Sequence, residues 1–397
     1  MNDGRSMGID AAALLSRVRS HSPLIVDFIR RLAAVESPTD VPTSQAAVQD
    51  LLTEELRILG YHVRRRTGRA TGGLLLASPL DRKRGRPLQL LVGHTDTVWR
   101  VGTLRDMPIA EEDGMLRGPG VFDMKAGLTL ILFALRVLRE MDLEPPATPV
   151  VLMNADEEIG SPESGPTVRR LARRAARAFV AEPSFGPEGK LKTARKGVAN
   201  FDVFITGRPA HAGLDPGGGA SAVEELAHVI RKLHALTDLE RGTTVNVGVV
   251  DGGTRPNVVA ARARAQVDVR IVTAEDGREV ERAIRALEPE TPGVSLRVEG
   301  GIGIPPMERT PGNRRLWAAA LAAAAELGLE LDETMVGGAS DGSVISQYTA
   351  TLDGLGAVGD GAHAAHEHVV VDATVDRCAL LAMLLMAPLD PMTSEGA

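Results

Sequence analysis

Hydrophobic residues recur along the chain with two different spacings, and the pattern changes near residue 190. Before this point, runs at helical spacing alternate with short apolar runs typical of buried strands. The helical runs include Ala11–Ala34, Ser44–Leu59 and Lys125–Leu138, and the strand runs include Leu88–Val92 and Pro149–Met153. Buried strands that alternate with helices favour a mostly parallel sheet covered on both faces. We therefore predict an α/β fold for this part.

From residue 188 the apolar positions alternate as in half-exposed strands. In the run Val258–Ile271, for example, Val267, Val269 and Ile271 face one way and Asp268 and Arg270 the other. The predicted order, starting with a strand at Lys192–Arg195, is strand, strand, helix, strand, strand, helix, strand. This order fits an α+β module with helices on one face of an antiparallel sheet.

The first pattern returns after Pro305, with helices expected at Asn313–Leu327 and Thr374–Met386. We therefore predict one domain made of residues 1–187 and 308–397, interrupted by an inserted domain at 188–307.

Composition narrows the possible functions of the 397-residue chain. A net charge of −7 and 3% aromatic residues argue against nucleic-acid binding. Apolar runs fall short of the roughly 18 residues that span a membrane, so no membrane association is expected. Cys378 is the single cysteine, which excludes disulfides within the chain and zinc–thiolate clusters. We expect a cytoplasmic protein.

Polar residues with metal-binding chemistry stand where predicted strands end. Their positions are His94 with Asp96, Asp123, the acidic run Asp156–Glu158, Glu182, and His363. The first three have an ordinary structural alternative: a turn histidine bonded to Asp96, a helix N-cap at Asp123, or a solvated charge run at Asp156–Glu158. In open α/β sheets, however, ligands bind beyond the carboxyl ends of strands.

The chemistry of the set points to metal ions. Imidazole and carboxylate ligands without thiolate suit zinc, cobalt or manganese. Two histidines and three carboxylates are too many for one catalytic zinc, which usually takes three protein ligands. They suit a pair of metals that share a carboxylate and a water.

Five segments stand in the order and spacing of a known family. They are His94–Val98, Gly118–Lys125, Asp156–Gly160, Ala181–Pro183 and Gly361–Glu367. With them the chain resembles the di-zinc aminoacylase, acetylornithine deacetylase and carboxypeptidase G family over nearly its whole length. The region from Gly93 through Trp99 to Gly120 is most similar to the glutamate carboxypeptidase branch. The resemblance implies hydrolysis of an amide bond and an inserted dimerisation (lid) domain.

The resemblance also implies a role for each residue of the cluster. Asp123 would bridge two divalent ions, expected to be zinc, with cobalt or manganese also suited. His94 and Glu182 would complete one metal site, and Glu158 and His363 the other. Asp96 would orient His94. Glu157 would act as the general base, taking a proton from a water between the metals and returning it to the leaving amine.

The inserted module carries further matches to the family. His211 resembles a residue that stabilises the tetrahedral oxyanion in the partner subunit's site, which implies a homodimer. Asn257 and Arg270 resemble residues that face the substrate, and Gly338 lies in a substrate-side loop. Without the resemblance, His211 reads as a turn histidine, Arg270 as an exposed strand residue and Gly338 as part of a plain glycine turn.

Two departures from the family pattern affect these expectations. Ile304 stands where the carboxypeptidase G pattern has an arginine that grips the substrate's terminal carboxylate. We therefore expect poor cleavage of C-terminal glutamate conjugates unless Arg309 or Arg270 reaches the substrate. His366 and His368 lie beside His363, and we expect them at the surface.

Three functions follow from this pattern. The first is a carboxypeptidase-like hydrolase of a small or peptide-like substrate. The second is an N-acyl amino-acid deacylase or a hydrolase of a non-peptide amide. The third is an inactive binding protein, against which the intact acidic residues argue.

Overall fold

The computed structural model describes residues 9–389, which form two compact units. Unit 1 contains the chain up to Thr193, residues Arg309–Met335 and the chain from Ser340 onward. Unit 2 contains Ala194–Glu308 and Val336–Ala339. No helix among residues 9–389 is both long and apolar enough to cross a bilayer.

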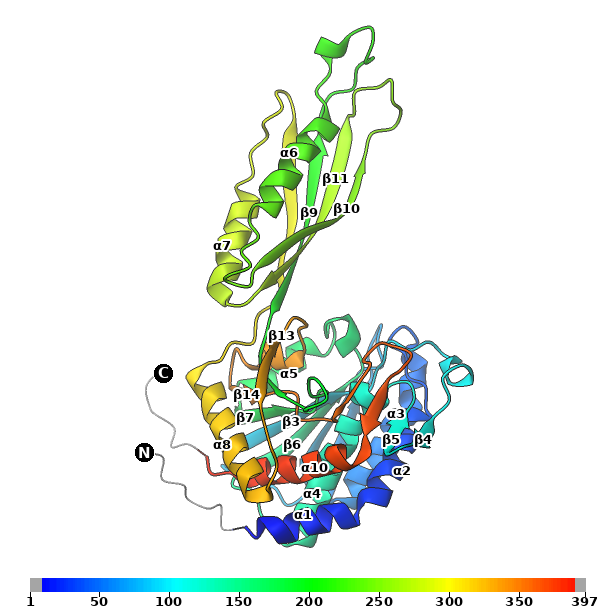
Figure 1. Ribbon diagram of the computed structural model, residues 1–397, viewed down its shortest axis with the longest axis vertical. Helices are drawn as coiled ribbons and strands as arrows, with labels where there is room; N and C mark the ends of the chain where they lie inside the picture. Colours follow the sequence, from blue (N-terminus) through cyan, green and yellow to red (C-terminus); the bar gives the residue numbers. More distant parts are fainter. Residues whose placement is uncertain (1–8, 390–397) are drawn as a thin grey trace. The chain divides into compact units, whose positions relative to one another are not determined.

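Unit 1 is built on a six-stranded sheet of order β1-β2-β6-β3-β7-β14 (Figure 1). Its strands are β1 (Tyr61–Arg66), β2 (Leu74–Pro79), β6 (Thr148–Asn154), β3 (Leu88–His94), β7 (Ala175–Val180) and β14 (Ala350–Leu352). The four strands from β6 to β14 are parallel, whereas β1 and β2 join antiparallel at one edge. The sheet is therefore mixed. The predicted parallel arrangement holds from β6 to the edge strand β14, and the opposite edge is antiparallel.

Helices cover both faces of this sheet, because successive residues of the central strands point to opposite sides. Leu91 packs into one core, whereas Leu90 and Val92 pack into another. The larger core is shared by α1 (Ala11–Ser20), α2 (Ser22–Ala33), α3 (Gln45–Ile58), α4 (Ala126–Glu140), α8 (Pro311–Leu327) and α10 (Val371–Met386). The smaller core is closed by α5 (Gly165–Ala172) and α9 (Asp341–Ile345).

A second sheet of unit 1 brings two distant motifs together. Its order is β15-β16-β5-β4, and its strands are β15 (Gly359–Asp360), β16 (His368–Val370), β5 (Met115–Arg117) and β4 (Ala110–Glu112). Antiparallel pairing of β16 with β5 places the segment before His368 beside the segment after Arg117. Sequence reasoning did not predict these short strands.

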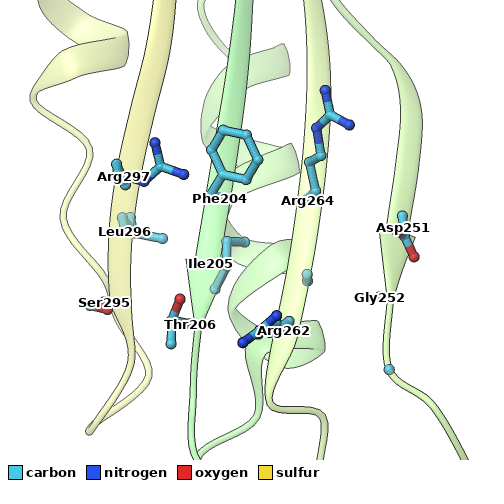
Figure 2. A pocket seen from close by; sticks show the side chains of 12 residues that line it. Phe204, Ile205, Thr206, Asp251, Gly252, Arg262, Arg264, Ser295, Leu296 and Arg297 are labelled. Atoms are coloured by element: carbon cyan, nitrogen blue, oxygen red, sulfur yellow. The ribbon is translucent and has the colours of Figure 1, made fainter.

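Unit 2 is an antiparallel sheet of order β10-β11-β9-β12 with two helices on one face. The elements are β9 (Gly197–Thr206), α6 (Ala222–His234), β10 (Thr244–Gly252), β11 (Arg262–Ile271), α7 (Ala274–Arg285) and β12 (Ser295–Ile304). On the open face, a hollow of about 510 Å³ surrounds Phe204, which Arg264 and Arg297 flank (Figure 2). None of the predicted site residues lines this hollow.

Three predicted elements differ from the structure. The run Ala11–Ala34 forms two helices, because Pro23 has no N–H to continue the first one and α2 begins at Ser22. The strand expected from Val258 begins only at Arg262, after a turn in which Val258 N donates to Arg255 O. Strand β8 (Leu191–Arg195) pairs with β13 (Glu333–Val336) and not with the sheet of unit 2.

Candidate metal centre

The predicted acidic and histidine residues of unit 1 gather at the carboxyl edge of the parallel strands. His94 is the last residue of β3, the run Asp156–Glu158 follows β6, and Glu182 follows β7. Because parallel strands end at the same edge of a sheet, their terminal side chains lie close together.

Asp123 lies between the two histidines of the cluster. Its Oδ1 atom is 3.2 Å from His94 Nε2, and its Oδ2 atom is 3.4 Å from His363 Nε2. On the first side Glu182 Oε1 lies 3.4 Å from His94 Nε2, and on the second Glu158 Oε2 lies 3.2 Å from His363 Nε2. The carboxylate of Asp123 thus connects two groups of potential ligands.

The donor atoms of the cluster are close enough to surround a cation. Those of His94, Asp123 and Glu158 lie within 4.8 Å of one another, and so do those of His94, Glu157 and Glu182. Glu158 Oε1 is buried and has no hydrogen-bond partner among the described residues. Buried carboxylate oxygens are normally paired or coordinated. The oxygen and imidazole donors and the unpartnered oxygen fit divalent cations.

Crowded charges shift the pKa values of these groups. Burial and the nearby Glu182 carboxylate raise the pKa of Glu157 well above its ordinary value. Hydrogen bonds to Asp123 and Glu158 raise the pKa of His363 to about 10. Burial alone would lower the pKa of His94, but the surrounding carboxylates outweigh it and the pKa is raised. The site is therefore strongly attractive to positive charge.

Asp96 is fully buried and holds several parts of the cluster. Its backbone oxygen lies 2.9 Å from His94 Nδ1, which leaves Nε2 directed at the other carboxylates. Its carboxylate accepts bonds from the backbone N–H groups of Glu157 and Glu158, at 3.3 and 3.2 Å. Thr39 Oγ1 donates to the same carboxylate at 2.8 Å. Thr39 had no motif that would have singled it out in the sequence.

Glu367 is a second fully buried acid beside the cluster. It accepts hydrogen bonds from three backbone N–H groups and from Trp99 Nε1. Burial raises its pKa to about 7, against the effect of these donors. Its spacing of four residues from His363 was visible in the sequence, but its contact with Trp99 was not. His366, by contrast, is exposed, as expected, while His368 is half-buried in β16.

The remaining predicted residues belong to unit 2. Strand-like pairing of His211 with Val258 brings the His211 and Asn257 segments together, and Ala212 N donates to Asn257 O at 3.1 Å. His211 Nδ1 accepts from Gly213 N and Leu214 N, both at 3.1 Å, so Nε2 carries the hydrogen. The Gly338 carbonyl accepts a bond from Arg195.

Arg270 and Arg309 are the arginines that could replace the family's carboxylate-binding arginine, and both already form ion pairs with acids. Arg270 forms a two-pronged contact with Asp268, at 2.8 and 2.9 Å. Arg309 in unit 1 bonds to Thr193 at 2.9 Å and to Glu333 at 3.0 Å. Ile304 is the half-buried last residue of β12.

Comparison with known proteins identifies the relatives of the chain. Carboxypeptidase G2 of Pseudomonas sp. strain RS-16 is 28% identical over 381 residues, covering 94% of this chain and 91% of that protein. Succinyl-diaminopimelate desuccinylase of Caulobacter sp. strain K31 is 28% identical over 382 residues, covering 89% and 94%. Acetylornithine deacetylase of Myxococcus xanthus is 31% identical over 220 residues, covering 52% and 55%.

Solved structures share the fold. Aminopeptidase PepT of Bacillus cereus has a TM-score of 0.75 at 23% identity, covering 92% of this chain and 98% of that one. A dinuclear metal-binding peptidase of Bacillus subtilis has a TM-score of 0.67 at 15% identity, covering 93% and 98%. The family model for peptidase family M20/M25/M40 matches residues 90–387. The chain therefore belongs to peptidase family M20/M25/M40.

Proposed function

We propose that the protein is a metal-dependent hydrolase of an amide bond next to an amino-acid carboxylate. The observation that carries the proposal is the position of Asp123, whose two oxygens face His94 and His363 separately. A single carboxylate between two such groups is the arrangement expected for two divalent cations. Zinc suits the donors, and cobalt or manganese would also do so.

The ligands divide into two sets. His94 and Glu182 would hold one cation, Glu158 and His363 the other, and Asp123 both. Glu157 also lies within 4.8 Å of donors of His94 and Glu182, so its side chain is close enough for either binding or proton transfer. We assign it proton transfer because the other five residues already supply three donors to each ion.

Bound cations would polarise the scissile carbonyl and make water more acidic. Glu157 would accept a proton from the attacking water and return it to the nitrogen of the leaving amine. Asp96 would keep His94 and the backbone of Glu157 in place through the contacts described above. Its role is to position the cluster, and no substrate contact is needed.

The same reaction gives His211 a role. With Nδ1 occupied by two backbone N–H groups, its Nε2–H is available to donate to an oxyanion. We propose that His211 serves the active site of a second subunit and that unit 2 is the lid and dimerisation domain. Asn257, Arg270 and Gly338 would contact the substrate or its surroundings.

The named relatives and the contacts of two arginines both bear on the substrate. Relatives include a carboxypeptidase and enzymes named for removing acetyl and succinyl groups from amino acids. Ile304 cannot bind a carboxylate, and Arg270 and Arg309 are engaged by acids. These contacts favour a second candidate, a substrate whose carboxylate is not gripped by an arginine at this position, such as another N-acyl amino acid or a non-peptide amide.

A matched pair of substrates tests these alternatives. We would measure kcat/KM of the zinc-loaded enzyme for an acyl-glutamate and for its α-amide, beside N-acetyl and N-succinyl amino acids. Because Ile304 replaces the carboxylate-binding arginine, we expect kcat/KM for the free acid to exceed that for the α-amide by less than about 100-fold, or roughly 2.7 kcal/mol. A larger preference would show that another cation grips the carboxylate. Absence of hydrolysis across the panel would contradict the proposed function.

A further inference from the structure

We propose that Glu367 is a positioning residue that holds three loops of the metal centre in one arrangement, with Trp99 as its side-chain partner. The inference rests on the proposed function, because two of these loops carry the proposed ligands Asp123 and His363 and the third follows the proposed ligand His94. Glu367 itself is not assigned to a metal.

The carboxylate of Glu367 accepts four hydrogen bonds. Oε1 accepts from Phe122 N at 2.9 Å and Asp123 N at 3.0 Å. Oε2 accepts from Gly120 N at 2.9 Å and Trp99 Nε1 at 2.6 Å. Three of the donors belong to the turn that carries Asp123, so the carboxylate fixes the backbone of the residue proposed to bridge the ions.

The backbone around Glu367 connects the remaining loops. Its carbonyl accepts a bond from Gly118 N at 3.2 Å, next to the pairing of β16 with β5. His363 lies four residues earlier in the same loop, with a left-handed backbone (φ 61°). Trp99 lies five residues after His94. The buried side chain of Glu367 therefore contacts the Asp123 turn and the loop after His94, and Glu367 itself belongs to the loop that carries His363.

A carboxylate is the group that this position requires. Both oxygens face N–H donors, so an amide in its place would turn an NH₂ group toward two of them. A carboxylate one methylene shorter would not span the same donors. The buried Lys125 ammonium attracts the charge of Glu367 and bonds to Val35 O at 2.7 Å. Groups that orient metal ligands typically change metal affinity or activity by about 10–100-fold when replaced.

The test is zinc affinity, measured on metal-free protein by competition with a fluorescent zinc chelator. Glu367→Gln should weaken zinc binding by about 10–100-fold. Trp99→Phe removes one donor and keeps a ring, so it should weaken binding less, by about threefold to tenfold. Saturating zinc should restore part of the lost turnover in both variants, as expected for displaced ligands.

Glu225 provides a matched control in unit 2. It is also fully buried and accepts two backbone N–H bonds, from Glu290 at 3.0 Å and Thr291 at 2.6 Å. Glu225→Gln should lower the unfolding temperature but leave zinc affinity within about twofold of the native value. This comparison separates positioning of the ligands from a general loss of stability.

Three outcomes decide the inference. If Trp99→Phe and Glu367→Gln both bind zinc as tightly as the native protein does, the inference is wrong, even if both variants are less stable. If Glu367→Gln does not fold, Trp99→Phe alone decides. If the native protein itself binds no zinc, the proposed function fails, and this result is distinct from the two others.

Discussion

Among single residues, Asp123 has the most constrained position, because its two carboxylate oxygens lie 3.2 and 3.4 Å from two different histidines. Glu157 and Glu158 are neighbours in the chain with different proposed roles. Asp96 accepts a backbone bond from each, which fixes both in relation to His94. Substitution of each glutamate in turn tests these two proposed roles directly.

Glu157→Gln should keep two metal ions per chain and lose about 10²–10⁴ in kcat, since it removes a general base and no ligand. Glu158→Gln, its matched control, should lose metal as well as activity. Elemental analysis and steady-state kinetics would be run on the same samples. A Glu157→Gln protein that is active but short of one ion would reverse the two assignments.

The gathering of these residues could be predicted because strand ends of a parallel sheet meet at one edge, and His94, Glu158 and Glu182 all follow such strands. The partners of Asp96 and Glu367 could not be predicted in the same way. Thr39 and Trp99 lie in loops whose path depends on tertiary packing, and no local pattern reports it. The roles of the individual residues stay predictions.

At the scale of elements, a loop before β2 is held by one side chain from the segment before α5. Glu163 accepts bonds from the N–H groups of Arg69, Ala70 and Thr71 and from Thr71 Oγ1. The Thr71 hydroxyl, followed by these backbone groups, lowers the pKa of Glu163 to about 2. The ionised carboxylate is thus the form that the folded state stabilises.

Glu163→Gln should therefore lower the urea midpoint at pH 7, and the difference from the native protein should shrink as the pH falls. A glutamate whose pKa is lower in the folded than in the unfolded state stabilises the fold at pH values above its unfolded pKa of about 4.3. This stabilisation is lost as the pH falls from there to the folded pKa of about 2. Urea unfolding between pH 7 and pH 3.5 measures the difference. Glu54→Gln, at an exposed glutamate, is the control. A difference that does not change with pH would show that charge is not involved.

Periodicity predicted the main elements of the sheets and their helices, and failed at boundaries. The division of Ala11–Ala34 at His21 was open to prediction from Pro23, since proline at the start of a helix is common. The pairing of β8 with β13 was not, because the two strands lie far apart in sequence and each is short. The short strands β4, β5, β15 and β16 carry too few residues to show a period.

At the scale of the whole molecule, the two units carry different parts of the proposed reaction. The proposed metal ligands belong to unit 1, and His211, Asn257 and Arg270 belong to unit 2. Membership of the family is established by the match over residues 90–387. The domain boundaries, the homodimer and the cytoplasmic location stay predictions.

Mixing two inactive variants tests whether the site is shared between subunits. In a dimer of His211→Ala with Glu157→Gln, one site receives an intact cluster and an intact His211. Random exchange should restore about one quarter of the native activity, because half of the dimers are mixed and each has one good site. Glu157→Gln mixed with Glu158→Gln should stay inactive, because both changes affect unit 1. Recovery in neither mixture, despite proven subunit exchange, would exclude the shared site.

The central claim is that His94, Asp123, Glu158, Glu182 and His363 hold two divalent cations that hydrolysis requires. Its most direct test is equilibrium dialysis of metal-free protein against zinc, with elemental analysis of the native chain and of Asp123→Asn. The account predicts two ions per native chain, activity that rises with their binding, and loss of tight binding in Asp123→Asn. Full amide hydrolysis by metal-free protein, or two tightly bound ions in Asp123→Asn, would contradict it.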